Sequence, residues 1–190
     1  MRKLYFILLF SLLIAENDRS YKLDKKSSNL LWKAKKVTGA HWGDIELKKG
    51  IIKVDKDGLP ISGEFVVDMS TIRVLDAKGS PWGINLENHL HSNDFFHTEK
   101  YPEAFFYITN SKKTDTGVII TGEMIIKGVK SPIEFSSRLS FSADIAIANG
   151  KIEIDRTLFN IKYRSGKFFS DLGDKMIDDI FTIEFDIKGE

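Results

Sequence analysis

Three histidines near the middle of the chain are the first residues whose chemistry we consider. His89, His91 and His97 lie close in sequence to Glu87 and Asp94, and imidazole and carboxylate groups are common ligands of zinc. The spacing does not favour a metal site, because residues two apart on a helix point away from each other. No H-E-x-x-H pattern or carboxylate triad is present either. We expect no metal and no cofactor. A metal-dependent enzyme is the least favoured of the three functions that we consider, after a binding protein and a structural or partner-binding module.

Residues for covalent catalysis are equally hard to assemble. The chain contains no cysteine, which excludes thiolate nucleophiles, thiolate metal ligands and disulfides. No G-x-S-x-G elbow occurs, and no Ser-His-Asp set can be chosen without arbitrariness. The adjacent carboxylates Asp178 and Asp179 would face opposite sides of a strand, so they cannot act jointly. We therefore expect that the protein is not an enzyme.

Arg156 is the most informative charged residue. The predicted strand register places it on an inward face beside Ile154 and Leu158, where an unpaired charge would be costly. Its guanidinium could contact a ligand headgroup, because it binds phosphate through two parallel hydrogen bonds. The interpretation that we favour is structural: a salt bridge to an inward acid at the barrel mouth, or a register that slips at a bulge. His89 is the second candidate for a headgroup contact.

The elements that would position these residues are β-strands. Apolar residues alternate with others from Leu139 to Ile147, the pattern of a strand with one face inward and one outward. The dipeptide Asn149-Gly150 follows, and it strongly favours a two-residue hairpin turn. A turn there would pair Ile147 with Ile152 and would match the apolar faces of both strands.

A second hairpin is predicted around Asp57-Gly58. The cross-strand pairs that this turn would form are Val54 with Ile61, Lys53 with Ser62, Ile52 with Gly63, and Gly50 with Phe65.

The rest of the chain predicts further strands and one helical interruption. Residues 80–96 lack the two-residue period and carry apolar residues at helical spacing, so we expect a short helix that starts at Ser80 or Asn85 and crosses over one end of a barrel. Short turns between about eight strands are typical of an antiparallel β-barrel or a sandwich. The additional strands are expected near residues 30–36, 104–110, 117–127, 133–139 and 182–188.

An eight-stranded barrel either fills with side chains or holds one small ligand. The residues expected inside it are apolar, and Gly63 and Gly122 on the same face would leave space. Simple core packing is the alternative for each of them. The candidate ligand-binding residues in the barrel and its helical cover are Phe65, Val67, Met69, Trp82, Leu86, Leu90, Phe106, Ile108, Met124, Ile126, Phe141, Ile145, Ile154 and Phe185.

The overall charge excludes one class of partner. The chain has 28 basic and 27 acidic residues, a formal net charge of +1. Nothing in this balance provides the positive field that nucleic-acid binding requires. We therefore expect no nucleic-acid partner.

The N-terminus has the pattern of a signal peptide. Arg2 and Lys3 precede an apolar run over residues 4–15, which ends at a small residue before the polar Glu16. We expect residues 1–15 to be a signal peptide, with cleavage anywhere up to about residue 20, and residues 21–190 to form one domain. The product would be periplasmic or secreted, with an uncleaved, membrane-tethered form as the alternative.

Taken together, the motifs resemble those of the YceI-like family of exported, lipocalin-like barrels. The densest run is LENHLHSNDFFHTEKYPEAFF over residues 86–106. Two positions depart from the family pattern: His97 stands where an acid is usual, and Asn160 stands where Gly is usual. The other matching residues are Trp32, Gly39, His41, Gly43, Gly63-Glu64-Phe65, Asp68-Met69, Gly122, Met124, Ile126, Gly128-Val129, Pro132, Asp155-Arg156, Phe159 and the terminal IDDIFTIEFDI.

The resemblance implies an all-β, eight-stranded antiparallel barrel with a hydrophobic pore and a short helical crossover capping one end. It also implies that the barrel holds a polyisoprenoid or another long-chain amphiphilic lipid, as a carrier, store or sequestering agent without a catalytic centre. Such a carrier would contact a membrane to exchange its lipid, and a homodimer is left open. The second hypothesis is a structural or partner-binding module with a solid core. A carrier predicts an apolar tunnel that opens near residues 82–96.

Overall fold

The computed structural model describes residues 18–190, so the predicted signal peptide lies outside the described residues. These residues form nine β-strands and one α-helix, α1 (Pro81–His91), with short 3-10 turns between some of them. The 3-10 turns are η1 (Lys25–Ser27), η2 (Arg156–Phe159) and η3 (Gly173–Lys175). The strands are β1 (Arg19–Lys22), β2 (Asn29–Lys36), β3 (Gly39–Val54), β4 (Pro60–Val74), β5 (Glu103–Thr114), β6 (Gly117–Ile126), β7 (Val129–Phe141), β8 (Ala146–Asp155) and β9 (Ile177–Gly189).

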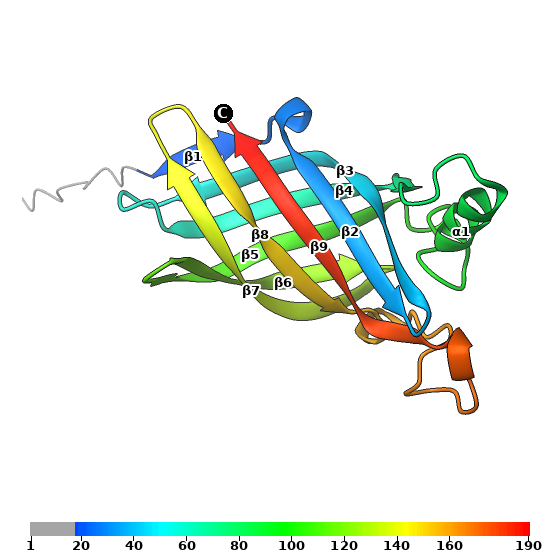
Figure 1. Cartoon of the computed structure of the whole chain (residues 1–190). Helices are drawn as coiled ribbons and strands as arrows, with labels where there is room; N and C mark the ends of the chain where they lie inside the picture. Colours follow the sequence, from blue (N-terminus) through cyan, green and yellow to red (C-terminus); the bar gives the residue numbers. More distant parts are fainter. Residues whose placement is uncertain (1–17) are drawn as a thin grey trace, which may run out of the picture.

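Strands β2 to β9 close into an antiparallel barrel. Each strand from β3 to β9 pairs with the one before it, and β9 returns to pair with β2. The short strand β1 pairs with the far end of β3 and lies outside this cycle of eight. Figure 1 shows the result as an elongated barrel with long, tilted strands. The predicted fold class is confirmed.

The hairpin turn predicted at Asn149-Gly150 is wrong. The turn lies earlier, because Phe141 pairs with Ala146 and the Ser142 hydroxyl accepts a hydrogen bond from the Ile145 amide at 3.1 Å. Asn149-Gly150 lies within β8 and is paired on both sides. Glycine is required there by close packing, since a Cβ on Gly150 would lie 2.8 Å from the ring of Phe185.

The hairpin around Asp57-Gly58 is mostly as predicted. The pairs Lys53 with Ser62, Ile52 with Gly63 and Gly50 with Phe65 are all present. Val54 pairs with Pro60 rather than Ile61, because the register shifts by one residue next to the turn. The predicted register therefore fails only at the pair closest to the turn.

Helix α1 connects β4 to β5 and covers one end of the barrel (Figure 1). It begins as predicted at Ser80, whose hydroxyl accepts a hydrogen bond from the Gly83 amide at 3.0 Å, and Pro81 occupies the first turn, where its missing N–H costs nothing. The connection from η2 to β9 lies at the same end, and its Tyr163 packs against Phe95 just after the helix (ring centroids 5.6 Å apart). No helix within residues 18–190 has the length and apolar character needed to cross a bilayer.

Candidate functional site

The interior of the barrel contains a cavity of about 190 Å³. All eight strands from β2 to β9 contribute lining residues, because the alternating pattern turns every second side chain inward. The lining is apolar except for Ser137, Arg156 and Asp178. A space of this kind accepts the apolar chain of a ligand and offers very few partners to polar groups along it.

Glycines shape the cavity differently from our expectation. We expected Gly63 and Gly122 to leave empty space, but a neighbouring side chain occupies the position over each of them. A Cβ on Gly122 would lie 2.4 Å from the ring of Phe106, and one on Gly63 would lie 2.9 Å from Ile108. Each glycine thus lets a large inward side chain lie against the barrel wall, which keeps that side chain out of the centre.

Most of the predicted interior residues line the cavity. They are brought together from β4, β5, β6, β8 and β9 and from the end of α1, and their role in binding a ligand stays a prediction. The predicted residues found in the lining are Phe65, Val67, Met69, Leu90, Phe106, Ile108, Met124, Ile126, Ile154 and Phe185.

Four predicted interior residues lie elsewhere. Trp82 is 45% exposed on α1 and packs against His41, while Leu86 packs onto the edge of the core without lining the cavity. Ile145 is exposed because it belongs to the turn between β7 and β8. Phe141 lines a second, small cavity of about 20 Å³ at the opposite end of the barrel. The misplaced Asn-Gly turn explains the error for Ile145.

Several lining residues were missed by sequence reasoning. Trp32 and Phe135 line the cavity, as do Phe181 and Ile183 of β9. The signal was present for Ile183, which shares the inward face of its strand with Phe185. Trp32 also donates from its indole nitrogen to the Arg73 carbonyl at 3.0 Å, which fixes the ring across the β3 strand.

Arg156 lies at the end of the cavity that α1 covers, and it is only 3% exposed. Its guanidinium donates to the carbonyls of Ile161 (2.8 Å), Ile177 (3.0 Å) and Asp178 (3.0 Å). The nitrogen that donates to Ile177, Nη2, also lies 3.4 Å from Asp179 Oδ1. Burial lowers the pKa of Arg156, against the opposing effect of the Asp179 carboxylate. The geometry matches the structural interpretation, and a headgroup contact stays a prediction.

The histidines of the cover are engaged with neighbouring groups. His89 Nε2 lies 3.0 Å from Asp94 Oδ2, and its ring meets Tyr163 edge-on (centroids 4.6 Å apart). His91 Nδ1 lies 2.9 Å from the Thr98 hydroxyl. His89 does not line the cavity, so its predicted headgroup contact has no support in this geometry. In the part of the chain that the structure describes, no three His, Cys, Asp or Glu side chains form a metal-binding group.

Tyr21 of β1 packs at the opposite end of the barrel. Its ring is buried against Phe141 (centroids 5.6 Å apart), and its hydroxyl donates to the Ser142 carbonyl at 2.6 Å. This contact ties β1 to the turn between β7 and β8. The small second cavity lies beside the main cavity, with Ile52 and Phe65 lining both.

Both positions that depart from the pattern of the YceI-like family have a left-handed backbone. Asn160 ends η2 with a φ of 59°, and His97 has a φ of 48°. Glycine adopts this conformation without strain, and asparagine is among the few other residues that visit it readily. Asn160 therefore replaces the usual glycine at low cost.

The comparison of sequences gives a family match over most of the chain and shorter matches to individual proteins. The YceI-like domain matches residues 21–189. Protein YceI of Escherichia coli is 36% identical over 84 residues, which are 40% of this chain and 43% of that protein. UPF0312 protein plu2095 of Photorhabdus laumondii is 42% identical over 53 residues, 28% of each chain. These matches span less than half the length of the two relatives.

The comparison of structures finds the same fold. BcnA of Burkholderia cenocepacia superimposes with a TM-score of 0.71 at 17% identity, over 88% of this chain and 99% of BcnA. A polyisoprenoid binding domain from Saccharophagus degradans gives a TM-score of 0.62 at 16% identity, over 90% of this chain and 97% of that domain. At these identities the similarity shows the fold alone. The family match and the shared barrel agree, and the chain belongs to the YceI-like family.

Proposed function

We propose that this protein is an exported carrier that holds a polyisoprenoid or a similar long-chain amphiphilic lipid inside its barrel. The observation that carries the proposal is the interior cavity, whose lining from eight strands is apolar apart from three residues. Among the residues that the structure describes, Arg156 and Asp178 are the charged lining groups, and they lie at the end covered by α1. A ligand with a long apolar tail and at most one polar end matches this distribution.

The expected affinity follows from the burial of the tail. About ten methylene equivalents at ~0.8 kcal/mol each give roughly 8 kcal/mol before losses. Association and ordering reduce this value, which leaves an affinity on the order of micromolar, tighter for a tail that fills more of the cavity. Because the lining offers few polar partners, affinity should depend more on tail length than on the headgroup.

Two further observations support the proposal. The structural neighbour from Saccharophagus degradans is described as a polyisoprenoid binding domain. The basic and apolar N-terminal pattern supports export to the periplasm or secretion. The proposal contains no catalytic step.

Native mass spectrometry of the purified protein, followed by organic extraction, tests the proposal. We expect one long-chain lipid per chain, and its identification would define the ligand class. A protein without copurified lipid that also takes up no isoprenoid alcohol from solution would contradict the proposal. It would leave the partner-binding module as the better explanation.

A further inference from the structure

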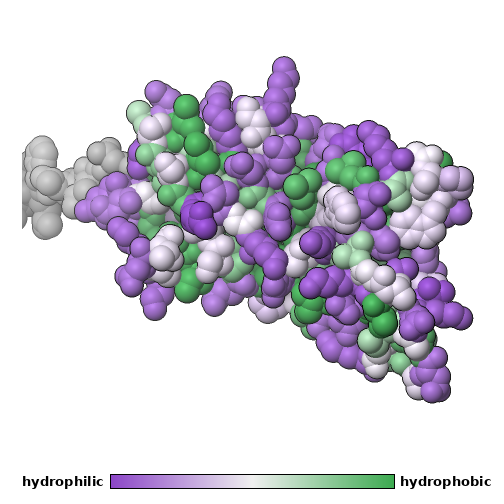
Figure 2. Space-filling view, viewed as in Figure 1, coloured by the Kyte–Doolittle hydropathy of each residue, from purple (hydrophilic) through white to green (hydrophobic). Residues whose placement is uncertain are grey.

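The connection between η2 and β9, residues 160–176, presents two adjacent aromatic side chains to solvent. Phe168 is 48% exposed and Phe169 is 51% exposed. Exposed Met176 packs beside Gly166 of the same connection. The Met176 carbonyl accepts a hydrogen bond from the Val37 amide, and the side chain of Val37 is also exposed. We call Val37, Phe168, Phe169 and Met176 the docking tip. Figure 2 shows hydrophobic residues among charged ones on the projection formed by this connection.

The aromatic pair is held outward by an ordered backbone. The amides of Phe168 and Phe169 both donate to the Ser165 carbonyl at 3.1 Å. Ser165 itself is fully buried, and so are Phe159 and Ile161 at the start of the connection. The exposure of the two rings is therefore a fixed feature of a well-anchored loop, although apolar side chains of this size normally pack inward.

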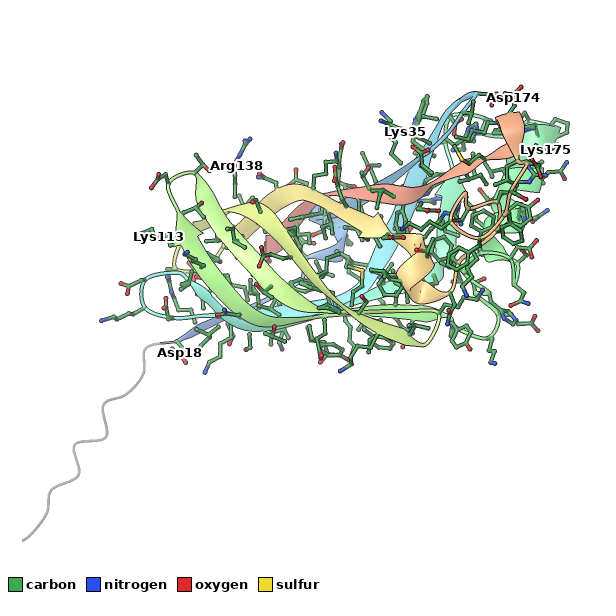
Figure 3. The ribbon with its side chains drawn as sticks, turned by 90° about the horizontal axis from the view of Figure 1, so that it is seen from below. Asp18, Lys35, Lys113, Arg138, Asp174 and Lys175 are labelled. Atoms are coloured by element: carbon green, nitrogen blue, oxygen red, sulfur yellow. The ribbon has the colours of Figure 1, made fainter. Side chains whose placement is uncertain are left out.

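Two lysines lie next to residues of the docking tip. Lys162 Nζ lies 4.6 Å from the centre of the Phe168 ring, and Lys175 precedes Met176. Within the described part of the chain, neither lysine has an ion-pair partner. Figure 3 places Lys175 at the same end of the molecule as Lys35. Residues 160–176 contain four basic and two acidic side chains, a local charge of 4 − 2 = +2: Lys162, Arg164, Lys167 and Lys175 against Asp171 and Asp174.

The docking tip adjoins the charged end of the cavity. Ile161 near the start of the connection and Ile177 directly after it both line the cavity. The pairing between β2 and β9 is irregular at the same place, since Ala34 pairs with Phe181 whereas Lys36 pairs with Ile177. Three residues of β9 therefore bulge away from β2 beside a cavity-lining alanine.

We infer that the docking tip binds the surface of an anionic lipid bilayer. Two exposed aromatic side chains and two lysines without an ion-pair partner match the interfacial region of such a bilayer, where rings enter the acyl boundary and cations meet lipid phosphates. The biological role of this contact rests on the proposed function, since the contact would place the charged end of the cavity against the bilayer from which the carrier takes its lipid. The bilayer contact itself does not require a filled cavity.

The lack of cysteine allows a local test in the full chain, because one introduced cysteine carries the only thiol label. Ser170→Cys places a polarity-sensitive dye next to Phe169. Asp144→Cys places it in the turn at the opposite end of the barrel. Each labelled protein is titrated with vesicles of phosphatidylglycerol and phosphatidylcholine, and with vesicles of phosphatidylcholine alone. We expect a blue shift only for Ser170→Cys, stronger with the anionic vesicles and reversed by salt.

Two variants in the Ser170→Cys background show which side chains cause the blue shift. Phe168→Ser with Phe169→Ser should raise the lipid concentration needed for half of the shift by at least about tenfold, and Lys162→Gln with Lys175→Gln should remove the preference for anionic vesicles. Ile147→Ser, which removes an exposed aliphatic side chain of β8, is the matched control and should change nothing.

Four outcomes would overturn the inference. The first is an equal shift at Asp144→Cys, and the second is unchanged binding by the double Phe variant. The third is a shift that grows with protein concentration in the absence of vesicles, which would assign the docking tip to a second copy of the chain. Uptake of an isoprenoid alcohol in solution is measured on the same variants. The fourth outcome is uptake of the alcohol without any binding to vesicles, which refutes this inference alone. A failure of the unmodified protein to take up the alcohol would refute the proposed function.

Discussion

At the scale of single residues, the cavity depends on where large inward side chains are allowed to lie. Phe65 illustrates this, because it pairs across the strands with Gly50 and its ring covers that glycine. A Cβ on Gly50 would lie 2.6 Å from the Phe65 ring, and the other near atom belongs to the side chain of Leu23. The backbone therefore does not clash, and the ring is the group that must move.

The variant Gly50→Ala should therefore narrow the cavity without preventing folding. We expect the affinity for an isoprenoid alcohol to fall severalfold, since the displaced Phe65 ring enters space that the ligand would occupy. The free energy of unfolding should fall by about 1–3 kcal/mol. Gly50→Ala combined with Phe65→Leu should recover part of the affinity. Unchanged binding by the single variant would show that the ring does not limit the space.

Asp155 gives a pH-dependent prediction at the same scale. Burial raises the pKa of this carboxyl, but hydrogen bonds from Lys167 (2.7 Å) and from the amide and hydroxyl of Thr157 outweigh burial and lower it. Because the pKa is lower in the folded protein, the stabilisation is present above the unfolded value of about 4 and is lost as the pH falls through the folded value.

Asp155→Asn should therefore lower the free energy of unfolding at pH ~7 by about 1 kcal/mol, as is typical for the loss of a capping carboxylate. The difference from the unmodified protein should shrink toward pH ~3, below the unfolded value of about 4, because the carboxyl gradually loses its charge in the folded protein as well. Urea unfolding at both pH values measures this. Asp144→Asn, in an exposed turn, is the control and should behave like the unmodified protein. A constant difference across pH would contradict the assignment.

The sequence predicted which apolar residues share the face of a strand better than it predicted the orientation of side chains near turns and on the helix. Ten candidates, such as Phe106 and Phe185, do line the cavity, because alternation within a strand fixes which side chains share a face. Ile145 and Trp82 were misplaced, because their direction depends on where a turn falls and on how a helix sits over the barrel. Arg156 was expected inside from a mistaken register, and it lies inside because η2 turns it there.

At the scale of elements, the turn between β7 and β8 is the point where local and tertiary preferences disagree. Asn149-Gly150 has the composition of a tight turn, yet it pairs with Arg138 and Ser137 of β7 and with Asp186 and Phe185 of β9. Closing the barrel requires both pairings. The tertiary requirement for a long β8 therefore overrides the local turn signal, and no feature of the dipeptide itself reveals this.

Insertion of a short Gly-Ser segment distinguishes the two positions. Between Ala143 and Asp144 the insertion should be tolerated, with the circular dichroism spectrum unchanged, because these residues lie outside the strands and the insertion disturbs the hydrogen bonds between Ser142 and Ile145 without removing a strand pair. Between Asn149 and Gly150 it should abolish cooperative thermal unfolding, because β8 is bonded on both sides there. The reverse pattern would restore the Asn-Gly hairpin and reject the described register.

At the scale of the whole molecule, the two ends of the barrel differ. Tyr21 packs at one end through a buried ring and a hydrogen bond, while the other end carries α1 and the connection from η2 to β9, which includes the aromatic pair of the docking tip (Figure 1). Strand alternation and the break at residues 80–96 predicted an antiparallel barrel or a sandwich with a helical crossover, and the resemblance to the YceI-like family favoured the barrel. The cavity was not, since alternation alone does not tell a filled interior from an open one.

The most direct test of the central claim, that the interior binds a long-chain lipid, compares two substitutions on neighbouring positions of β8. Ala148 lines the cavity, whereas Ile147 next to it points outward. The three proteins, unmodified, Ala148→Phe and Ile147→Phe, are titrated with a fluorescent isoprenoid alcohol. We predict that Ala148→Phe weakens binding at least about tenfold, since displacing two methylenes is enough, and that Ile147→Phe binds normally. Equal affinities for all three proteins would show that the ligand does not occupy the barrel interior.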